Sequence, residues 1–375
     1  MSVNVAENKG LEDVVVGPSG ISSIIDDVLT YRGYSIDDLT DNATCFEEIV
    51  FLLWQGRLPK QAELDALKQS ITEGAAVPKE VMDIVRSFPK TANPMDVLRT
   101  AVSALGIYDP QNDETSAEAN MAKATRLQGQ LATLITGFER LRNGQEPLAP
   151  KPGLTLAANF LYMLKGADPD SVAVKGFEKA LILHADHEFN ASTFAARQTA
   201  STLSDMHSCI TSAIGTLKGP LHGGANTAVM AMLTEVGTAE NAEPWIKDAL
   251  AKKKKIMGFG HRVYENGDPR AKHLRQMSKE LAERTGDPKW YQMSIKIDEV
   301  VKAEKGLLTN VDFYSASTYH YMGIPGDQFT PIFALSRLSG WAAHVMEQLA
   351  NNRLIRPRAD YTGPAAQKYV PVDKR

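Results

Sequence analysis

The sequence predicts an all-α protein with a few short strands near its N-terminus. Apolar residues recur at helical spacing through most of the 375-residue chain, whereas short β-branched runs split by glycine, proline and aspartate are confined to residues 10–33. The chain is also longer than the roughly 250–300 residues at which one hydrophobic core usually stops growing. We therefore expect two closely packed helical domains.

The individual elements follow in order along the chain. Short strands are expected at residues 14–16, 21–25 and 29–31. A helix should follow, because Thr44 and Glu47 have the spacing of a capping box and precede an apolar face that starts at Phe46. Further helices are expected at residues 61–72, 94–105 and 117–142. Glycine and prolines predict a loop at residues 143–153, and helical patterns resume after it.

The composition excludes several classes of protein. The formal charge of -4 gives no basic field for nucleic acid, and no stretch approaches the roughly 20 apolar residues that cross a bilayer. Cys45 and Cys209 lie far apart and outside any C-x-x-C pattern, which argues against a disulfide scaffold. Residues 1–9 lack the pattern of a targeting segment. We expect a cytoplasmic protein that binds neither nucleic acid nor membrane.

Two glycine-rich turns each contain a histidine. His222 lies in KGPLHGGAN, before a predicted helix, where free N–H groups and the helix dipole favour a neutral imidazole. His261 lies in GFGHRVY, whose glycines allow the backbone to approach a ligand closely. A neutral imidazole can donate a hydrogen bond to an oxygen. Both are candidate catalytic residues, although a histidine on a turn is more often structural.

A carboxylate and two arginines are further candidates. Asp312 lies among apolar residues in NVDFYSA, where burial would raise its pKa toward the range of a general base; the alternative is a helix N-cap. Arg270 in DPR could bind a carboxylate through its planar fork. Arg337 lies on the apolar face of a predicted helix and needs an anionic partner, either an internal carboxylate or a ligand.

His184 and His187 invite a metal-site interpretation. Their spacing would place both rings on one face of a helix. Zinc enzymes of the H-E-x-x-H kind use a different spacing, with glutamate between the histidines. We therefore expect no metal site.

Taken together and in this order, five segments resemble citrate synthases. They are HADHEFNAST at 184–193, GPLHGGAN at 219–226, GFGHRVY with DPR at 258–270, NVDFYSA at 310–316, and LSRLSGWAAHVMEQ at 335–348 running on into IRPRADYTG. The resemblance extends from about Leu11 to Gly363. It implies a Claisen-type condensation of acetyl-CoA with oxaloacetate, followed by hydrolysis to citrate and CoA.

The resemblance assigns roles residue by residue. His222 would stabilise the enol of acetyl-CoA, Asp312 would remove the methyl proton, and His261 would polarise the ketone of oxaloacetate. The residues implied to bind oxaloacetate are His187, Arg270, Arg337 and, donated across the interface of a homodimer, Arg356. The resemblance implies no cofactor and no metal besides the two substrates.

The resemblance also implies a citrate synthase-like two-domain fold. A large dimerisation domain would comprise residues 1–221 and 324–375, and a small domain of residues 222–323 would close over the substrates. The residues implied to contact CoA are Lys255, Ile256, Gly258, Gly260 and Arg262. The family usually has a basic or polar residue four positions after the second histidine, but Glu265 stands there. We therefore expect Arg262 and Lys255 to meet the CoA phosphates.

Three alternatives stay open. The sequence resembles 2-methylcitrate synthases, which use propionyl-CoA, in the same motifs. One methylene in a pocket is worth only about 1–3 kcal/mol, so the sequence separates the two activities poorly. A metal-dependent hydrolase could be built on His184 and His187. A catalytically silent scaffold could retain the fold without the reaction.

Overall fold

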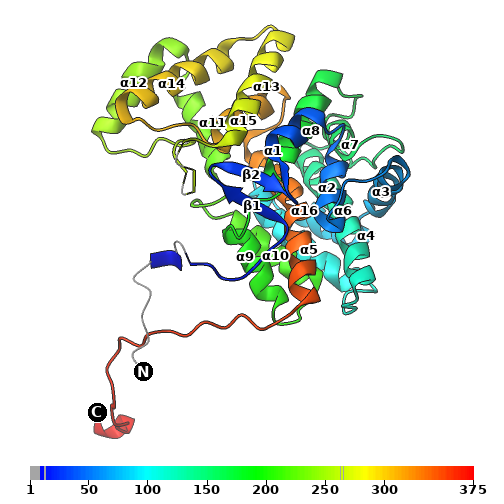
Figure 1. Ribbon diagram of the computed structural model, residues 1–375, viewed down its shortest axis with the longest axis vertical. Coiled ribbons are helices and arrows are strands. Elements are labelled where there is room, and N and C mark those ends of the chain that lie inside the picture. The colour runs from blue at the N-terminus through cyan, green and yellow to red at the C-terminus, as the bar shows by residue number, and fades with distance from the viewer. Residues whose placement is uncertain (1–8, 12–13, 262, 265) are drawn as a thin grey trace.

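The computed structural model confirms the all-α fold with short N-terminal strands (Figure 1). It describes residues 9–11, 14–261, 263–264 and 266–375. Within this part of the chain, none of the helices is both long and apolar enough to cross a membrane.

The strands form one small antiparallel sheet. Its order is β1 (Ser22–Ile25), β2 (Val28–Tyr31) and β3 (Tyr34–Ser35). Asp26 and Asp27 join β1 to β2 with positive φ angles of 51° and 61°, as a type I′ hairpin turn requires. Two of the expected strands are thus confirmed. The expected strand at residues 14–16 is wrong, because this β-branched run is exposed and lies outside the sheet.

The start of helix α2 (Phe46–Gln55) corrects one prediction. Thr44 pairs with Glu48, whose Oε1 accepts from the Thr44 N–H at 2.7 Å and from its hydroxyl at 2.6 Å. Glu47 points into the protein instead and accepts from the N–H of Leu156 at 2.7 Å. The predicted capping box is therefore wrong, because Glu47 satisfies a free N–H at the start of helix α7 (Leu156–Lys165).

The part of the chain up to Leu217 builds most of the helical body. Its helices are α1 (Ile36–Asn42), α2, α3 (Gln61–Gly74), α4 (Lys79–Ser87), α5 (Pro94–Tyr108), α6 (Ala117–Arg142), α7 (Leu156–Lys165), α8 (Ser171–His184), α9 (Ala191–Ala200) and α10 (Met206–Leu217). The predicted helices in this part are confirmed, and α6 has the predicted bounds.

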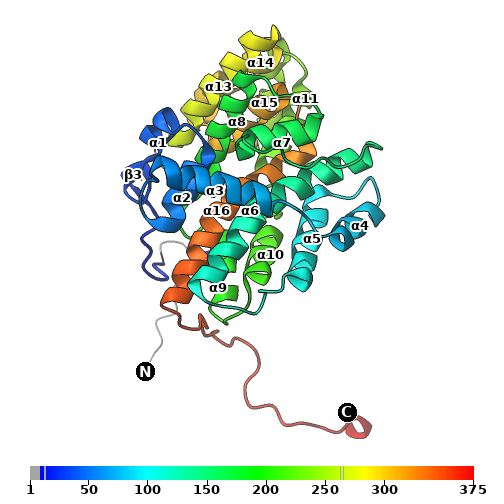
Figure 2. The ribbon, with the colours of Figure 1, turned by 90° about the vertical axis from the view of Figure 1, so that its right-hand side faces the viewer.

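A second group of helices gathers at one end of the molecule, at the top of both views (Figures 1 and 2). It consists of α11 (Ala225–Val236), α12 (Ala239–Ala251), α13 (Pro269–Thr285), α14 (Lys289–Lys305) and α15 (Val311–Tyr321). Within it, α13 packs on α15 and α12 packs on α14.

Helix α16 (Phe329–Ala350) forms the centre of the body, packing on α2, α6, α8, α9 and α10. It approaches the end of α8 very closely at Gly340, where an added Cβ would lie 2.5 Å from the carbonyl oxygen of Ala185. Glycine is therefore needed at this crossing. The close approach brings Arg337, one turn earlier on α16, next to the segment that contains His187.

The chain leaves the body after α16. Residues 351–375 extend away from the rest of the molecule in both views and end in the short 3-10 helix η3 (Val372–Lys374) (Figures 1 and 2). This segment exposes several large apolar side chains, namely those of Leu354, Tyr361, Tyr369, Val370 and Val372.

Candidate active site

His222 lies on the turn between α10 and α11, as the sequence predicts. Its Nε2 accepts a hydrogen bond from the backbone N–H of Ser192 at 3.3 Å, and the Ser192 hydroxyl lies 2.8 Å from the same nitrogen. Because a backbone N–H can only donate, the neutral ring carries its hydrogen on Nδ1. Burial, assisted by the charge of Arg337, lowers the pKa of His222 to about 4. The imidazole is therefore a neutral N–H donor at physiological pH.

His261 is held as the opposite tautomer. Its Nδ1 accepts from the backbone N–H groups of Val263 and Tyr264, at 3.0 and 3.4 Å. The hydrogen of the neutral ring therefore lies on Nε2. Burial and the charge of Arg270 lower the pKa of this histidine to about 4. Like His222, it can donate a hydrogen bond to an oxygen but carries no charge of its own.

Asp312 lies in the first turn of α15, in a buried environment that suits its carboxylate to act as a general base. The N-cap of this helix is Asn310, whose side chain accepts from the Asp312 N–H at 3.1 Å, so the N-cap alternative for Asp312 is wrong. Its Oδ1 is buried without a hydrogen-bond partner in the described part of the chain. Burial raises the pKa of Asp312 to about 7, although the charges of Arg270 and Arg337 oppose this shift. A carboxylate tuned in this way can accept a proton near neutral pH.

The glycine loop before His261 packs directly against the start of α15. Asn310 donates its backbone N–H to Gly258 O and its side-chain N–H to Gly260 O, both at 2.9 Å. A Cβ at Gly258, whose φ is +83°, would lie 2.9 Å from the Cβ of Phe313. These glycines therefore fix the position of the base relative to His261, whether or not a ligand also contacts them.

Arg270 is buried and paired. Its Nε and Nη2 each donate to one carboxylate oxygen of Asp268 at 2.8 Å. Burial is the largest influence on the pKa of Arg270 and would lower it, but the charge and hydrogen bonds of Asp268, together with Tyr264 and Tyr31, outweigh burial and raise the pKa. Asp268 Oδ2 also accepts from the backbone N–H of Val311 at 3.0 Å, which ties this ion pair to the start of α15.

Arg337 is buried without such a partner. It is 1% exposed, donates from Nε to the carbonyl oxygen of His184 at 2.7 Å, and lies with its guanidinium carbon 4.8 Å from the ring centroid of Phe333. Among the described residues, no carboxylate lies within ion-pair distance of it. Burial lowers its pKa to about 10. Of the two predicted partners, the structure therefore favours an external anion over an internal salt bridge.

His187, which follows α8 in the helical body, is the last of the predicted site residues that lie close together. Its Nε2 lies 2.9 Å from the hydroxyl of Tyr264, and its ring centroid lies 5.2 Å from that of His261. Burial, followed by the charges of Arg270 and Arg337, holds its pKa well below 6.5. Helix α8 ends at His184, so His184 and His187 do not share a helical face, and that premise of the metal-site interpretation is wrong.

The N-terminal hairpin braces this group from outside. Glu188, next to His187, accepts from the Ile24 N–H at 2.7 Å, and its own N–H donates to the Ser22 hydroxyl at 2.9 Å. At the tip of the hairpin, Asp27 accepts from the backbone and side-chain N–H groups of Asn266, at 3.0 and 2.7 Å. The hairpin thus joins the His187 segment to the loop that follows His261.

Other predicted site residues are not placed in this group. Arg356 is exposed in the C-terminal segment, and Lys255 is exposed after α12, whereas Ile256 is 8% exposed and belongs to the core. Arg262 and Glu265 lie outside the described residues.

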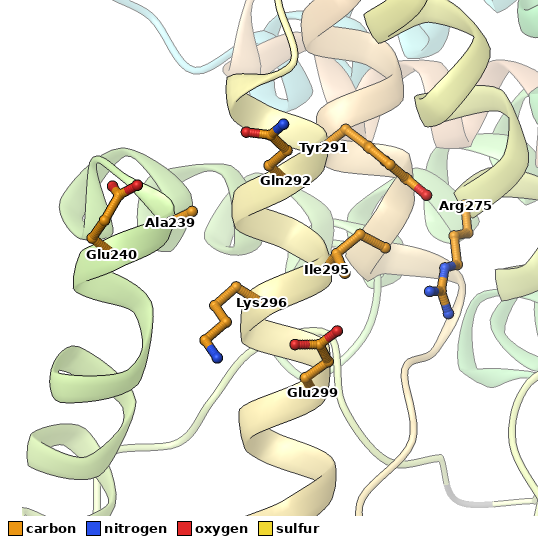
Figure 3. A pocket seen from close by; sticks show the side chains of 8 residues that line it. All are labelled: Ala239, Glu240, Arg275, Tyr291, Gln292, Ile295, Lys296 and Glu299. Carbon is orange, nitrogen blue, oxygen red and sulfur yellow. The ribbon is translucent and has the colours of Figure 1, made fainter.

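A pocket of about 500 Å³ lies elsewhere, among α12, α13 and α14 (Figure 3). It is lined by Ala239, Glu240, Arg275, Tyr291, Gln292, Ile295, Lys296 and Glu299. Two acidic and two basic side chains balance one another there, and none of the predicted site residues lines it. This pocket is therefore not the candidate site.

Three residues at the site had no signal in the sequence. Ser192 sets the tautomer of His222, Asp268 pairs with Arg270, and Tyr264 contacts His187. The motifs HADHEFNAST, DPR and GFGHRVY contain all three residues, but only the tertiary contacts show what they do.

The fold and the site define a class of enzyme. Two neutral histidine donors, a buried carboxylate base and two buried arginines suit the removal of a weakly acidic proton beside a carbonyl group. The comparisons with known proteins identify the family. The model of the citrate synthase C-terminal domain matches residues 10–358, and the chain belongs to the citrate synthase family.

Its relatives agree with this family. The chain is 59% identical to citrate synthase 2 of Bacillus subtilis strain 168, covering 98% of this chain and 99% of the relative. It is also 46% identical to a 2-methylcitrate synthase of Mycobacterium tuberculosis, covering 95% and 90%. Among solved structures, it is similar to the citrate synthase of Thermoplasma acidophilum in a ternary complex with carboxymethyl coenzyme A and oxaloacetate, with a TM-score of 0.92, 35% identity, and coverage of 98% and 99%.

We predict that Asp312→Asn stabilises the protein more at pH 8 than at pH 5. The folded-state pKa of about 7 lies above the usual 3.8, so the folded protein favours the protonated carboxyl. The ionised Asp312 carboxylate therefore destabilises the wild-type protein. This cost is absent below about pH 4, grows between about pH 4 and 7, and is complete above that range. Replacement by a neutral amide should raise stability at pH 8 by up to about 4 kcal/mol. Chemical unfolding at both pH values measures it, and an equal effect at both would contradict the raised pKa.

Proposed function

We propose that this enzyme condenses acetyl-CoA with oxaloacetate and hydrolyses the product to citrate and CoA. The observation that carries the proposal is the buried carboxylate of Asp312, whose pKa of about 7 and unpartnered Oδ1 suit it to proton abstraction. The membership of the chain in the citrate synthase family supports the choice of substrates.

The first step is removal of a methyl proton from acetyl-CoA. Asp312 takes the proton, and the electron pair of the C–H bond moves toward the thioester oxygen. The Nδ1–H of His222 donates to that oxygen and stabilises the enol. Because the donor is neutral and already oriented by Ser192, little reorganisation is needed as the charge develops.

The second step joins the enol carbon to the ketone carbon of oxaloacetate. The Nε2–H of His261 donates to the ketone oxygen and supplies its proton as the new carbon–carbon bond forms, while the thioester carbonyl re-forms. The proton that Asp312 took from the methyl group then replaces the one lost by His261, so that both residues return to their starting states. Arg270, Arg337 and His187 hold the two carboxylates so that the reacting carbons meet. The lack of an ion-pair partner for Arg337 among the described residues supports this assignment. Water then cleaves the thioester, and the reaction needs no cofactor or metal.

The CoA contacts at residues 256–260 are proposed on the resemblance, and those of Lys255 and Arg262 because Glu265 stands where the family usually has a basic or polar residue. Lys255, Ile256, Gly258, Gly260 and Arg262 would follow the adenine and phosphate groups. For Gly258, Gly260 and Ile256, the packing against α15 and the core gives an additional structural reason for the residue type.

We also propose that residues 222–323 close as a small domain over a large domain of residues 1–221 and 324–375. The grouping of α11 to α15 at one end of the molecule supports this division (Figure 1). His222, His261 and Asp312 would belong to the moving part and His187 and Arg337 to the other, so closure would complete the site and exclude water.

The site is proposed to be shared within a homodimer in the cytoplasm. Arg356 would reach the oxaloacetate of the partner. The exposed C-terminal segment supports the homodimer, because a second copy of the chain could cover its apolar side chains. The free, buried thiols of Cys45 and Cys209 suit a reducing compartment.

A second candidate is the condensation of propionyl-CoA to 2-methylcitrate. The relative from Mycobacterium tuberculosis named 2-methylcitrate synthase favours it, and the difference of one methylene is small. The metal-dependent hydrolase has no corresponding support.

We predict that wild-type enzyme releases thiol from acetyl-CoA only when oxaloacetate is present, and that Asp312→Asn lowers turnover by about 10²–10⁴-fold. The oxaloacetate KM should change little, because the amide removes the base and leaves the arginines in place. Thiol release from acetyl-CoA and propionyl-CoA, each with and without oxaloacetate, measures both points.

Each other outcome of this assay has a distinct meaning. A higher kcat/KM with propionyl-CoA would change the substrate and keep the residues. Release without oxaloacetate would indicate a thioesterase, and near wild-type turnover of Asp312→Asn would remove the base from the mechanism.

We predict that Arg356→Leu and Asp312→Asn complement one another in mixed dimers. If Arg356 acts across the interface, a heterodimer of the two variants contains one complete site and one doubly defective site. Random co-assembly should then restore about a quarter of wild-type activity. If Arg356 acts within its own subunit, no heterodimer has a complete site and activity stays at the level of the two variants alone.

A further inference from the structure

Tyr264 lies between two of the predicted oxaloacetate residues. It is 5% exposed, and its hydroxyl lies 2.9 Å from Nε2 of His187. Its ring centroid lies 4.5 Å from that of His261, with the planes inclined by 43°. The side chain of Tyr264 thus contacts both His187, which follows α8, and His261, which lies on the glycine loop before α13.

The same residue contacts the site through other atoms. Its backbone N–H donates to Nδ1 of His261 at 3.4 Å and so helps to set the tautomer of that ring. The guanidinium carbon of Arg270 lies 5.9 Å from the centroid of the Tyr264 ring. Three residues expected to bind or polarise oxaloacetate are therefore arranged around Tyr264.

The hydrogen bond of the Tyr264 hydroxyl joins two neutral groups, the phenol of Tyr264 and the imidazole of His187. Burial raises the pKa of Tyr264, so the phenol keeps its proton, and His187 is neutral because its pKa is lowered. A neutral hydrogen bond between buried partners adds little charge, but it restricts rotation of the His187 ring. Without it, one buried nitrogen of His187 would lose its partner and the ring could turn away from a bound carboxylate.

We propose that Tyr264 is a positioning residue of the oxaloacetate half of the site. Its hydroxyl fixes the ring of His187 for carboxylate binding, and its ring fixes the plane of His261 for polarising the ketone. The proposal rests on the proposed function, because both histidines act on oxaloacetate there.

The two parts of the side chain can be tested separately. Tyr264→Phe removes the hydroxyl and keeps the ring, whereas Tyr264→Leu removes both. Tyr321→Phe is a matched control, since the Tyr321 hydroxyl also makes a hydrogen bond, accepting from the Tyr291 N–H at 2.9 Å, but contacts none of the site residues. Steady-state kinetics would give kcat and both KM values, and calorimetry would give the oxaloacetate Kd without acetyl-CoA.

Tyr264→Phe should raise the oxaloacetate KM and Kd by about tenfold, with kcat and the acetyl-CoA KM within about threefold of wild type. Tyr264→Leu should in addition lower kcat by about 10- to 100-fold, because His261 loses its orientation. Tyr321→Phe should leave all of these values unchanged.

The proposal is overturned if Tyr264→Phe leaves oxaloacetate binding unchanged, or if it shifts both KM values together with the unfolding temperature as a general packing defect would. Its failure differs from failure of the proposed function. In the latter case wild-type enzyme itself would form no citrate from the two substrates.

Discussion

The buried guanidinium of Arg337 is the constraint on which the rest of the site depends. A charge removed from water without a carboxylate partner is strongly unfavourable. Among the described residues, Arg337 contacts the carbonyl oxygen of His184 and the face of Phe333 but forms no ion pair, and the charge of Asp186 only partly offsets its burial. Its positive charge helps to keep His222 and His187 neutral, which their roles as donors require. The same charge limits the rise in the pKa of Asp312. One unpaired arginine therefore influences both halves of the proposed reaction.

Backbone packing holds the groups around this charge. Gly340 lets α16 cross the end of α8, and Gly258 lets the His261 loop pack against α15. Both contacts leave no room for a Cβ. The first fixes Arg337 relative to the His187 segment, and the second fixes His261 relative to Asp312. The N-terminal hairpin adds a polar brace through Glu188 and Asp27. Such a framework keeps the donors oriented before any substrate binds, which is the condition for electrostatic catalysis.

The sequence predicted the helices well where apolar spacing was regular, as in α6, because helical periodicity is a local property. It failed where tertiary contacts decided the outcome. Glu47 had the spacing of a capping residue, yet it is buried and caps α7. The partner of Arg337 could not be decided from its helix alone, since an internal carboxylate could have come from any other element. Tyr264 and Ser192 gave no signal, because their roles depend on segments distant in sequence. The place of Arg356 depends on a second subunit, so it stays a prediction.

The central claim is that oxaloacetate supplies the anion that Arg337 lacks. The most direct test compares the unfolding of wild type and Arg337→Leu with and without oxaloacetate. Oxaloacetate at about 100 times its Kd should stabilise the wild-type protein by roughly 2.7 kcal/mol. The leucine variant should be at least as stable as wild type without ligand and should gain little from the same oxaloacetate concentration. A variant that is much less stable than wild type without ligand, yet is stabilised fully by oxaloacetate, would show that Arg337 is a structural residue and would contradict the account.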